Sequence, residues 1–217
     1  LDILISKGRL AEEENLKVVV LTGDGSAYGM GLSATSAAMD RGLDFYYLCY
    51  DNEGYGNTGH QDSSATPKGA RTATSTSGEG YTGRKKDLFS IWAAHKPAYL
   101  ATIIAAEPLD LAHKIETAME VKGPKMFITL APCPTGWYYD PGLTVEIGKL
   151  AVKTGIWPLK EYRNGDVTHT KIIKNRLPVE EYLKLQGRFE HLFLPQKNKL
   201  VIDDIQSGVD GYWKDIS

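Results

Sequence analysis

The sequence predicts an α/β fold built on a doubly wound, mostly parallel sheet, with a hairpin and a helix as a C-terminal extension. Apolar runs typical of buried strands alternate with segments of helical periodicity along the 217 residues. Two apolar runs near the start of the chain end in polar, glycine-rich turns, at the sheet edge where α/β folds bind ligands. An Asn-Gly pair between two β-rich runs indicates a hairpin near the C-terminus.

The first part of the chain is predicted to form a strand, a helix and a second strand. We expect strands at residues 17–21 and 45–50 and a helix over residues 26–40, whose small side chains allow close packing against a sheet. Gly42 should follow that helix as a left-handed cap. Residues 11–15 are polar and should lead from a short helix into the first strand.

Residues 62–84 form a long segment rich in Ser, Thr, Gly and Ala. This composition allows a mobile linker. Loops of such length inside compact domains are more often functional or bound to a partner, which is the alternative interpretation.

The alternation of strands and helices then resumes and supports a parallel sheet. We expect helices at 86–95, 109–121, 143–154 and 178–193, strands at 99–106 and 125–131, and a hairpin built from 157–162 and 167–172. In the helix over 109–121, Ile115, Ala118 and Met119 should face inward. The tail from residue 195 has a mixed composition and should lie against a partner.

Composition excludes several classes of function. The formal net charge of −2 gives no indication of nucleic acid or an anionic membrane, and no apolar run approaches the ~20 residues that cross a bilayer. The two cysteines, Cys49 and Cys133, do not suggest a disulfide framework, and Cys49 should be a small buried hydrophobe in a strand. The first ten residues lack a signal-peptide pattern, so the default location is the cytoplasm.

Oxygen-bearing groups follow both of the first two predicted strands. Asp24 supplies a carboxylate, Asn52 an amide oxygen, and the turn beyond it a backbone carbonyl such as that of Gly54. Oxygen ligands of this kind suit Mg²⁺, which usually completes its shell with water and substrate phosphates. The sequence therefore predicts a magnesium site at this edge of the sheet.

The residues around Asp24 are also suited to a bulky anion. Gly23 and Gly25 allow the backbone to come close to a ligand, and the N–H groups of Gly25, Ser26 and Ala27 should face it at a helix N-terminus. A Gly-Asp-Gly tripeptide by itself is equally typical of an ordinary turn. The asparagine- and glycine-rich turn after the second strand favours the metal and phosphate interpretation.

These motifs resemble those of a known family. Gly-Asp-Gly followed by an Asn-containing turn is similar to the signature of thiamine-diphosphate enzymes. More narrowly, Y-D-N-E-G-Y-G-N-T-G-H-Q-D-S-S-A-T-P, together with K-K-D-L, L-A-P-C-P-T-G-W and P-V-E-E-Y-L-K-L-Q-G-R-F, resembles the β subunit of 2-oxoacid:ferredoxin oxidoreductases, pyruvate synthase in particular. The resemblance covers nearly the whole chain.

The resemblance implies roles for the turn after Asn52. It implies that Asn57 points at the thiazolium ring and the substrate, where an amide can stabilise developing negative charge. Thr58, Gly59 and Gln61 would line the same pocket. His60 is an unfavoured candidate for a general base, because the aminopyrimidine of thiamine diphosphate supplies its own base.

The resemblance also implies an iron–sulfur ligand and a longer chain. Cys133, in A-P-C, would be the last ligand of a [4Fe–4S] cluster, which needs four thiolates. The chain begins at Leu1, and we expect an N-terminal part with further cysteines to precede it. Residues 1–156 would form the thiamine-diphosphate-binding domain, and residues 157–217 the hairpin, helix and partner-contacting tail of the same domain.

The function implied is oxidative decarboxylation of a small 2-oxoacid in an oxygen-sensitive complex. Partners would be α-, γ- and δ-type subunits, ferredoxin and coenzyme A, with the activating glutamate on another subunit. Pyruvate is the default substrate, and oxalate or 2-oxoglutarate are alternatives. A non-oxidative thiamine-diphosphate decarboxylase or synthase, and a non-catalytic nucleotide- or phosphate-binding module, remain as competing classes.

Overall fold

The computed structural model describes residues 2–9, 11, 16–214 and 216. Its strands are β1 (Val19–Gly23), β2 (Phe45–Asp51), β3 (Tyr99–Ile104), β4 (Pro124–Leu130), β5 (Lys160–Arg163) and β6 (Asp166–His169). They form one sheet in the order β1-β2-β4-β3-β5-β6, in which β1 to β4 pair in parallel and β5 and β6 are antiparallel. The predicted α/β class and mostly parallel sheet are confirmed.

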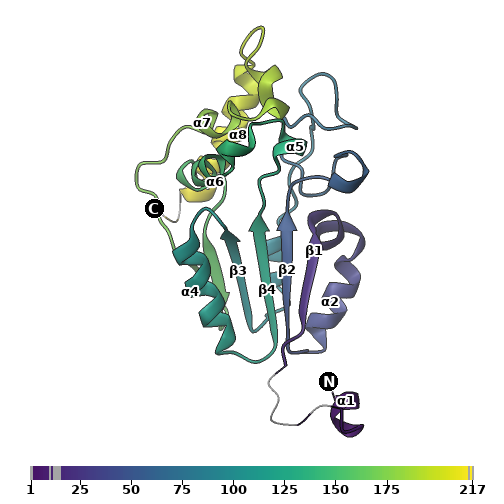
Figure 1. Cartoon of the computed structure of the whole chain (residues 1–217). Coiled ribbons are helices and arrows are strands. Elements are labelled where there is room, and N and C mark those ends of the chain that lie inside the picture. Colours follow the sequence, from purple (N-terminus) through teal and green to yellow (C-terminus); the bar gives the residue numbers. More distant parts are fainter. Residues whose placement is uncertain (1, 10, 12–15, 215, 217) are drawn as a thin grey trace.

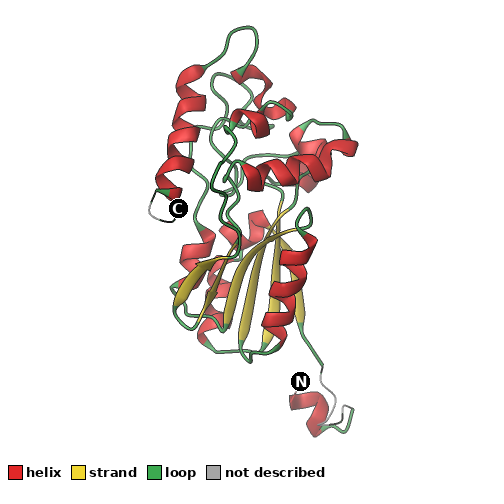
Figure 2. Ribbon diagram, turned by 90° about the vertical axis from the view of Figure 1, so that its left-hand side faces the viewer, coloured by secondary structure: helices red, strands yellow, loops and turns green. Residues whose placement is uncertain are grey.

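Helices lie on both faces of the sheet and beyond its carboxyl edge (Figures 1 and 2). They are α1 (Asp2–Ser6), the π-helical turn η1 (Gly25–Met30), α2 (Leu32–Asp40), η2 (Gly56–Thr58), α3 (Leu88–Ala93), α4 (Pro108–Met119), α5 (Pro134–Trp137), η3 (Pro141–Leu143), α6 (Thr144–Lys153), α7 (Glu180–Leu183), η4 (Gly187–Leu192) and α8 (Lys199–Trp213). None of these helices is long and apolar enough to span a bilayer. In Figure 1, α5 to α8 gather above the carboxyl ends of the parallel strands, so the C-terminal part of the chain covers that edge.

Several local predictions hold in the structure. Gly42 adopts φ +61° and ends α2, and Asn164 and Gly165 adopt φ 56° and 96° between β5 and β6, as a type I′ hairpin turn requires. The first strand lies two residues later than predicted, at Val19–Gly23. Of the predicted linker 11–15, residues 12–15 lie outside the described part of the chain.

Residues 63–72 of the long segment before α3 are packed against the fold, although no helix or strand lies between residues 62 and 87, all of which are described. Ala65, Thr66 and Ala70 are fully buried. The Ala70 carbonyl accepts a hydrogen bond from the Tyr81 N–H, so the segment closes on itself. The mobile-linker alternative does not describe this arrangement.

The prediction that Met119 faces inward is wrong. Met119 is 64% exposed, and Lys114 takes the inward position with Ala118. Lys114 can be buried because its Nζ donates to the Thr102 carbonyl at 2.9 Å and pairs with Asp110 at 2.7 Å. Its aliphatic stem packs while its charge stays satisfied, which apolar periodicity alone does not predict.

The prediction of one continuous helix over 178–193 is wrong. The single helix expected over 178–193 is broken into α7 and η4, because Gln186 is extended and Gly187 passes so close to Tyr138 that a Cβ would lie 2.8 Å from its backbone oxygen. The mixed tail forms the 15-residue helix α8. This helix packs on the chain's own core through buried side chains such as Ile202 and Trp213.

The orientation of α8 can be tested with two aliphatic truncations. Ile202→Ala should lower the free energy of unfolding by about 2–5 kcal/mol, because the side chain is buried against the core. Leu200→Ala should change it by no more than about 0.5 kcal/mol, since Leu200 is 83% exposed. Urea denaturation measures both values, and equal losses would contradict this orientation.

Candidate cofactor and metal site

The first two strands bring the predicted site residues together. β1 and β2 pair in parallel up to Gly23 and Tyr50, so the turns that follow them leave the sheet at the same edge. Asp24 follows β1 and is only 1% exposed. Asn52 follows β2, and its backbone carbonyl accepts a hydrogen bond from Trp137 Nε1 in α5 at 2.8 Å.

Three groups converge at this edge. The end of the Asn52 amide lies 2.8 Å from Asp24 Oδ1 and 2.8 Å from the Gly54 carbonyl oxygen. With its nitrogen turned toward these oxygens, the amide donates a hydrogen bond to each. With its oxygen turned toward them, three oxygens face one another without a proton between them. The other carboxylate oxygen of Asp24 accepts a hydrogen bond from Ser63 Oγ.

The second orientation of the amide fits a hard cation. Ligand oxygens at 2.0–2.1 Å from Mg²⁺ on adjacent octahedral positions stand about 2.9 Å apart, close to the separations seen here. Within the described residues, no three His, Cys, Asp or Glu side chains gather as a metal site. A cation here would therefore rely on one carboxylate, neutral oxygens and a ligand's phosphates, which is the usual arrangement for Mg²⁺.

The surroundings of Asp24 indicate that a nearby positive charge would stabilise its ionised carboxylate. Burial, followed by the neighbouring Asp51 carboxylate, raises the pKa of Asp24 to about 6. The hydrogen bond from Ser63 and the charge of Lys85 act in the opposite direction. A divalent cation beside Asp24 would act in the same direction as Lys85, because it favours the ionised carboxylate.

The glycines around Asp24 differ in what they accommodate. A Cβ on Gly25 would lie 2.2 Å from the Tyr55 ring, so Gly25 is needed for Tyr55 to pack there. A Cβ on Gly23 would make an ordinary 3.5 Å contact with Tyr50. Gly25 and Ala27 are buried, whereas Ser26 is partly exposed. The close approach at Gly25 is therefore made by an aromatic ring of the same chain, a role that the sequence did not indicate.

The predicted substrate-facing residues lie on an open turn. Asn57, Thr58 and Gly59 are exposed, and Gln61 is partly exposed. Gln61 ties the turn together, because its Nε2 donates to the Thr58 carbonyl at 2.6 Å. Tyr55 N–H donates to the Gln61 carbonyl at 3.0 Å, which closes the base of the turn. The turn thus presents Asn57 outward from a fixed base.

His60 is placed in a packing position. It is 5% exposed, and its ring lies so close to Gly54 and Gly136 that a Cβ on either would come within 2.8 Å and 2.4 Å of it. Neither ring nitrogen has a hydrogen-bond partner among the described residues. Burial and the charge of Arg188 lower the pKa of His60. The imidazole is therefore enclosed between Gly54 and Gly136, and its expected lack of a general-base role stays a prediction.

Sequence reasoning missed a buried ion cluster on either side of Asn52. Lys85 Nζ lies 2.7 Å from both Asp51 Oδ2 and Glu53 Oε1, and Arg188 Nη2 lies 2.6 Å from Glu53 Oε2. Tyr28 Oη donates to Asp51 Oδ2 at 2.6 Å. The acids flanking Asn52 were visible as D-N-E, but no local pattern connects them with a lysine and an arginine so distant in the sequence.

The two acids of this cluster respond differently to their surroundings. Burial raises the pKa of Asp51 although Lys85 is adjacent. Burial also opposes ionisation of Glu53, but the charges of Lys85 and Arg188 together lower its pKa. Glu53 is therefore held as a carboxylate between two cations.

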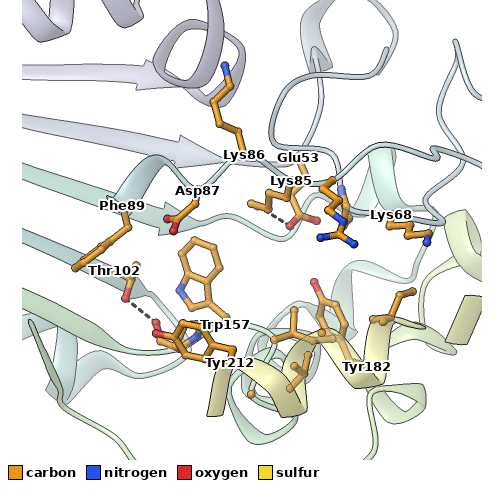
Figure 3. Close-up of a pocket in the computed structure, with 18 of the residues that line it drawn as sticks. Glu53, Lys68, Lys85, Lys86, Asp87, Phe89, Thr102, Trp157, Tyr182 and Tyr212 are labelled. Carbon is orange, nitrogen blue, oxygen red and sulfur yellow. Dashed lines mark hydrogen bonds and ion pairs between the residues drawn. The ribbon is translucent and has the colours of Figure 1, made fainter. Parts of the chain in front are cut away.

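A cavity of about 670 Å³ opens beside this cluster (Figure 3). Glu53 and Lys85 lie on one side of it, and Trp157, Tyr182 and Tyr212 lie on the opposite side. The cavity therefore joins the loop before α3 to the C-terminal elements, and Glu53 and Lys85 of the ion cluster form part of its polar wall.

Cys133 lies just beyond β4, at the start of α5, and is partly exposed. Its Sγ accepts a hydrogen bond from the Gly136 N–H at 3.3 Å. Cys49 is buried in β2, where burial raises the pKa of its thiol. A [4Fe–4S] cluster needs four thiolates, so these residues could supply one ligand and not a whole cluster site.

Comparison with known proteins assigns the chain to a family. The model of the thiamine pyrophosphate enzyme C-terminal TPP-binding domain matches residues 7–129. The chain is 45% identical over 204 residues to pyruvate synthase subunit PorB of Methanosarcina barkeri, which covers 93% of this chain and 69% of that protein. The chain belongs to the thiamine pyrophosphate enzymes, in the PorB group of 2-oxoacid oxidoreductase subunits.

Other relatives of this PorB-group chain are named for 2-oxoacids other than pyruvate. Ketoisovalerate oxidoreductase subunit VorB of Pyrococcus abyssi is 42% identical over 83% of this chain and 60% of its own length. A solved 2-oxoglutarate:ferredoxin oxidoreductase from Magnetococcus marinus, with 2-oxoglutarate, coenzyme A and succinyl-CoA bound, matches 61% of this chain and 45% of that chain with a TM-score of 0.52 and 25% identity. The chain spans about two thirds of the length of the curated PorB relatives.

The contact between Gly25 and Tyr55 yields a stability test. Gly25→Ala should lower the free energy of unfolding by about 1–3 kcal/mol, because its Cβ overlaps the ring. Gly29→Ala should be neutral or stabilising by up to about 1 kcal/mol, since its Cβ would lie 3.5 Å from Tyr55 Oη and alanine favours the helix. Thermal denaturation compares them, and adding Tyr55→Ala should remove the overlap; a cost that persists would contradict this explanation.

Proposed function

We propose that this chain is the thiamine-diphosphate- and Mg²⁺-binding β subunit of a cytoplasmic 2-oxoacid:ferredoxin oxidoreductase, which decarboxylates a small 2-oxoacid oxidatively. The observation that carries the proposal is the convergence of the Asp24 carboxylate, the Asn52 amide and the Gly54 carbonyl at the carboxyl edge of the sheet. Membership of a thiamine pyrophosphate enzyme family makes a diphosphate the natural anionic partner of that cation.

Asp24, Asn52 and Gly54 would hold Mg²⁺. Its remaining positions would be left to water and the diphosphate. The backbone beside Asp24, from Gly23 through Gly25 and Ser26 to Ala27, would contact the diphosphate. Bound thiamine diphosphate would supply an electron sink for loss of CO₂ from a 2-oxoacid.

Asn57 is our candidate catalytic residue. Asn57 lies on an exposed turn, from which its amide would contact a ligand bound at the sheet edge. An N–H donor there would stabilise negative charge that develops on the substrate. Thr58, Gly59 and Gln61 would line the same pocket. The exposure of this turn supports a site completed by another subunit, which would also bring the activating glutamate.

Cys133 would provide one thiolate of a [4Fe–4S] cluster whose other ligands lie outside this sequence. The N–H of Gly136 already donates a hydrogen bond to this sulfur and would help to hold the side chain in place. Electrons would leave the site through such clusters one at a time to ferredoxin, and the enzyme would be sensitive to oxygen.

Pyruvate is the proposed substrate, with coenzyme A as acetyl acceptor and α-, γ- and δ-type subunits as partners. The names of the PorB relatives support pyruvate. The 2-oxoglutarate enzyme among the solved structures supports 2-oxoglutarate as an alternative substrate. Oxalate is a further alternative, and activity assays with each of the three 2-oxoacids would distinguish them. A non-oxidative thiamine-diphosphate enzyme is the competing class.

Loss of the carboxylate at Asp24 tests the metal site. In the complex assembled with its partner subunits, Asp24→Asn should abolish thermal stabilisation by thiamine diphosphate with Mg²⁺, because the variant removes the anionic ligand. Asp40→Asn, at an exposed helix end, should leave that stabilisation unchanged. Differential scanning fluorimetry measures both, and a wild-type response from Asp24→Asn would contradict the assignment.

A matched pair of cysteine variants tests the cluster ligand. After purification without oxygen, Cys133→Ser should lower the iron content and visible absorbance of the complex while thiamine diphosphate is retained, because one thiolate is lost. Cys49→Ala, which changes the buried cysteine, should keep its iron. A wild-type complex that is colourless, free of iron and fully active would instead favour a non-oxidative enzyme.

A further inference from the structure

Three successive backbone carbonyls around Asn52 accept hydrogen bonds from outside the turn. The Asp51 carbonyl accepts a hydrogen bond from the Ala131 N–H at 2.8 Å, and the Asn52 carbonyl accepts one from Trp137 Nε1 at 2.8 Å. The Glu53 carbonyl accepts one from Thr66 Oγ1 at 2.9 Å. The geometry that brings the Asn52 amide and the Gly54 carbonyl toward Asp24 is therefore imposed from outside the turn.

Glu53 is the strained residue of this turn. Its φ of 64° lies in the left-handed region, which residues other than Gly, Asn and Asp seldom adopt. The conformation reverses the chain so that the Gly54 carbonyl, two residues after Asn52, returns to within 2.8 Å of the Asn52 side chain. Such a conformation persists only where the surroundings over-determine it.

Arg188 contacts both sides of the turn. Its Nη2 lies 2.6 Å from Glu53 Oε2, and its guanidinium carbon stands 3.8 Å from the centroid of the Trp137 ring that binds the Asn52 carbonyl. Arg188 Nε donates to Gln186 Oε1 at 2.9 Å, which fixes the orientation of the guanidinium plane. The side chain is 1% exposed and reaches this position from η4, in the Q-G-R-F motif.

We propose that Arg188 is a positioning residue for the cation site. By binding Glu53 and stacking on Trp137, it holds the flanks of Asn52 so that the Asn52 amide and the Gly54 carbonyl face Asp24. The inference rests on the proposed function, because the cation is the Mg²⁺ of that proposal. It assigns the Q-G-R-F motif a role in metal affinity.

A purely structural role for Arg188 predicts a different result. Losing a buried ion pair would lower thermal stability and subunit assembly, but the affinity of folded, assembled complexes for Mg²⁺ would not change. A positioning role predicts weaker Mg²⁺ binding in complexes that do fold, because groups that orient metal ligands typically change affinity by about 10–100-fold when removed.

The test uses the whole oxidoreductase complex, stripped of metal with EDTA and supplied with a fixed excess of thiamine diphosphate. Mg²⁺ binding is then titrated by calorimetry. Arg188→Gln should raise the Mg²⁺ dissociation constant at least about tenfold. Arg188→Lys keeps the charge but loses the planar stack, so it should raise the Mg²⁺ dissociation constant by a smaller factor. This variant also provides the test if the Arg188→Gln complex does not assemble. Arg176→Gln is the control: it removes a guanidinium that stacks on Trp213 and not on Trp137, and it should leave the Mg²⁺ affinity unchanged.

A rescue variant makes the test specific to the turn. Adding Glu53→Gly to Arg188→Gln removes the carboxylate that lost one of its two cationic partners and places glycine at φ 64°, where it is unstrained. This double variant should bind Mg²⁺ more tightly than Arg188→Gln alone. Wild-type affinity in assembled Arg188→Gln and Arg188→Lys complexes, or no recovery in the double variant, would overturn the inference alone. A wild-type complex that binds no Mg²⁺ with thiamine diphosphate would overturn the proposed function and the inference with it.

Discussion

The pairing of Glu53 with Lys85 and Arg188 is the constraint on which the carboxyl edge of this sheet depends. Asp24, Asp51 and Glu53 lie buried in the same region, and buried carboxylates destabilise a fold unless cations compensate them. Lys85 comes from the irregular segment before α3, and Arg188 comes from η4. Burial of the acids beside Asn52 therefore requires that both segments be packed over this edge of the sheet.

This constraint explains the shape of the C-terminal half. A continuous helix over 178–193 would satisfy local propensity, yet the chain extends at Gln186 and passes tightly against Tyr138 at Gly187. The break turns Arg188 toward Glu53 and Trp137. Contacts across the predicted boundary at residue 156 are thus as important to the site as those within the sheet. The later helix α8 joins the same core through Ile202.

The edge divides into a buried part and an open part. The oxygens of Asp24, Asn52 and Gly54 converge next to α5, whose Trp137 binds the Asn52 carbonyl. The turn that carries Asn57 is exposed. A ligand bridging the two parts would be held at its anionic end by this chain and left accessible at the other. That division suits a reacting centre completed by a second subunit, as our proposed function requires.

The amino-acid sequence by itself determined the fold class, the succession of the four parallel strands along the chain, and which oxygen-bearing residues follow the first two of them. These features follow from local patterns: apolar runs, helical periodicity, and turns rich in Gly, Asn and Asp. Only the tertiary structure decided that Lys114 and not Met119 faces inward, that Tyr55 occupies the space over Gly25, and that Arg188 reaches Glu53. Each of these depends on partners far apart in the chain, because the burial of a charge or ring is decided by what the fold places beside it and not by neighbours in sequence.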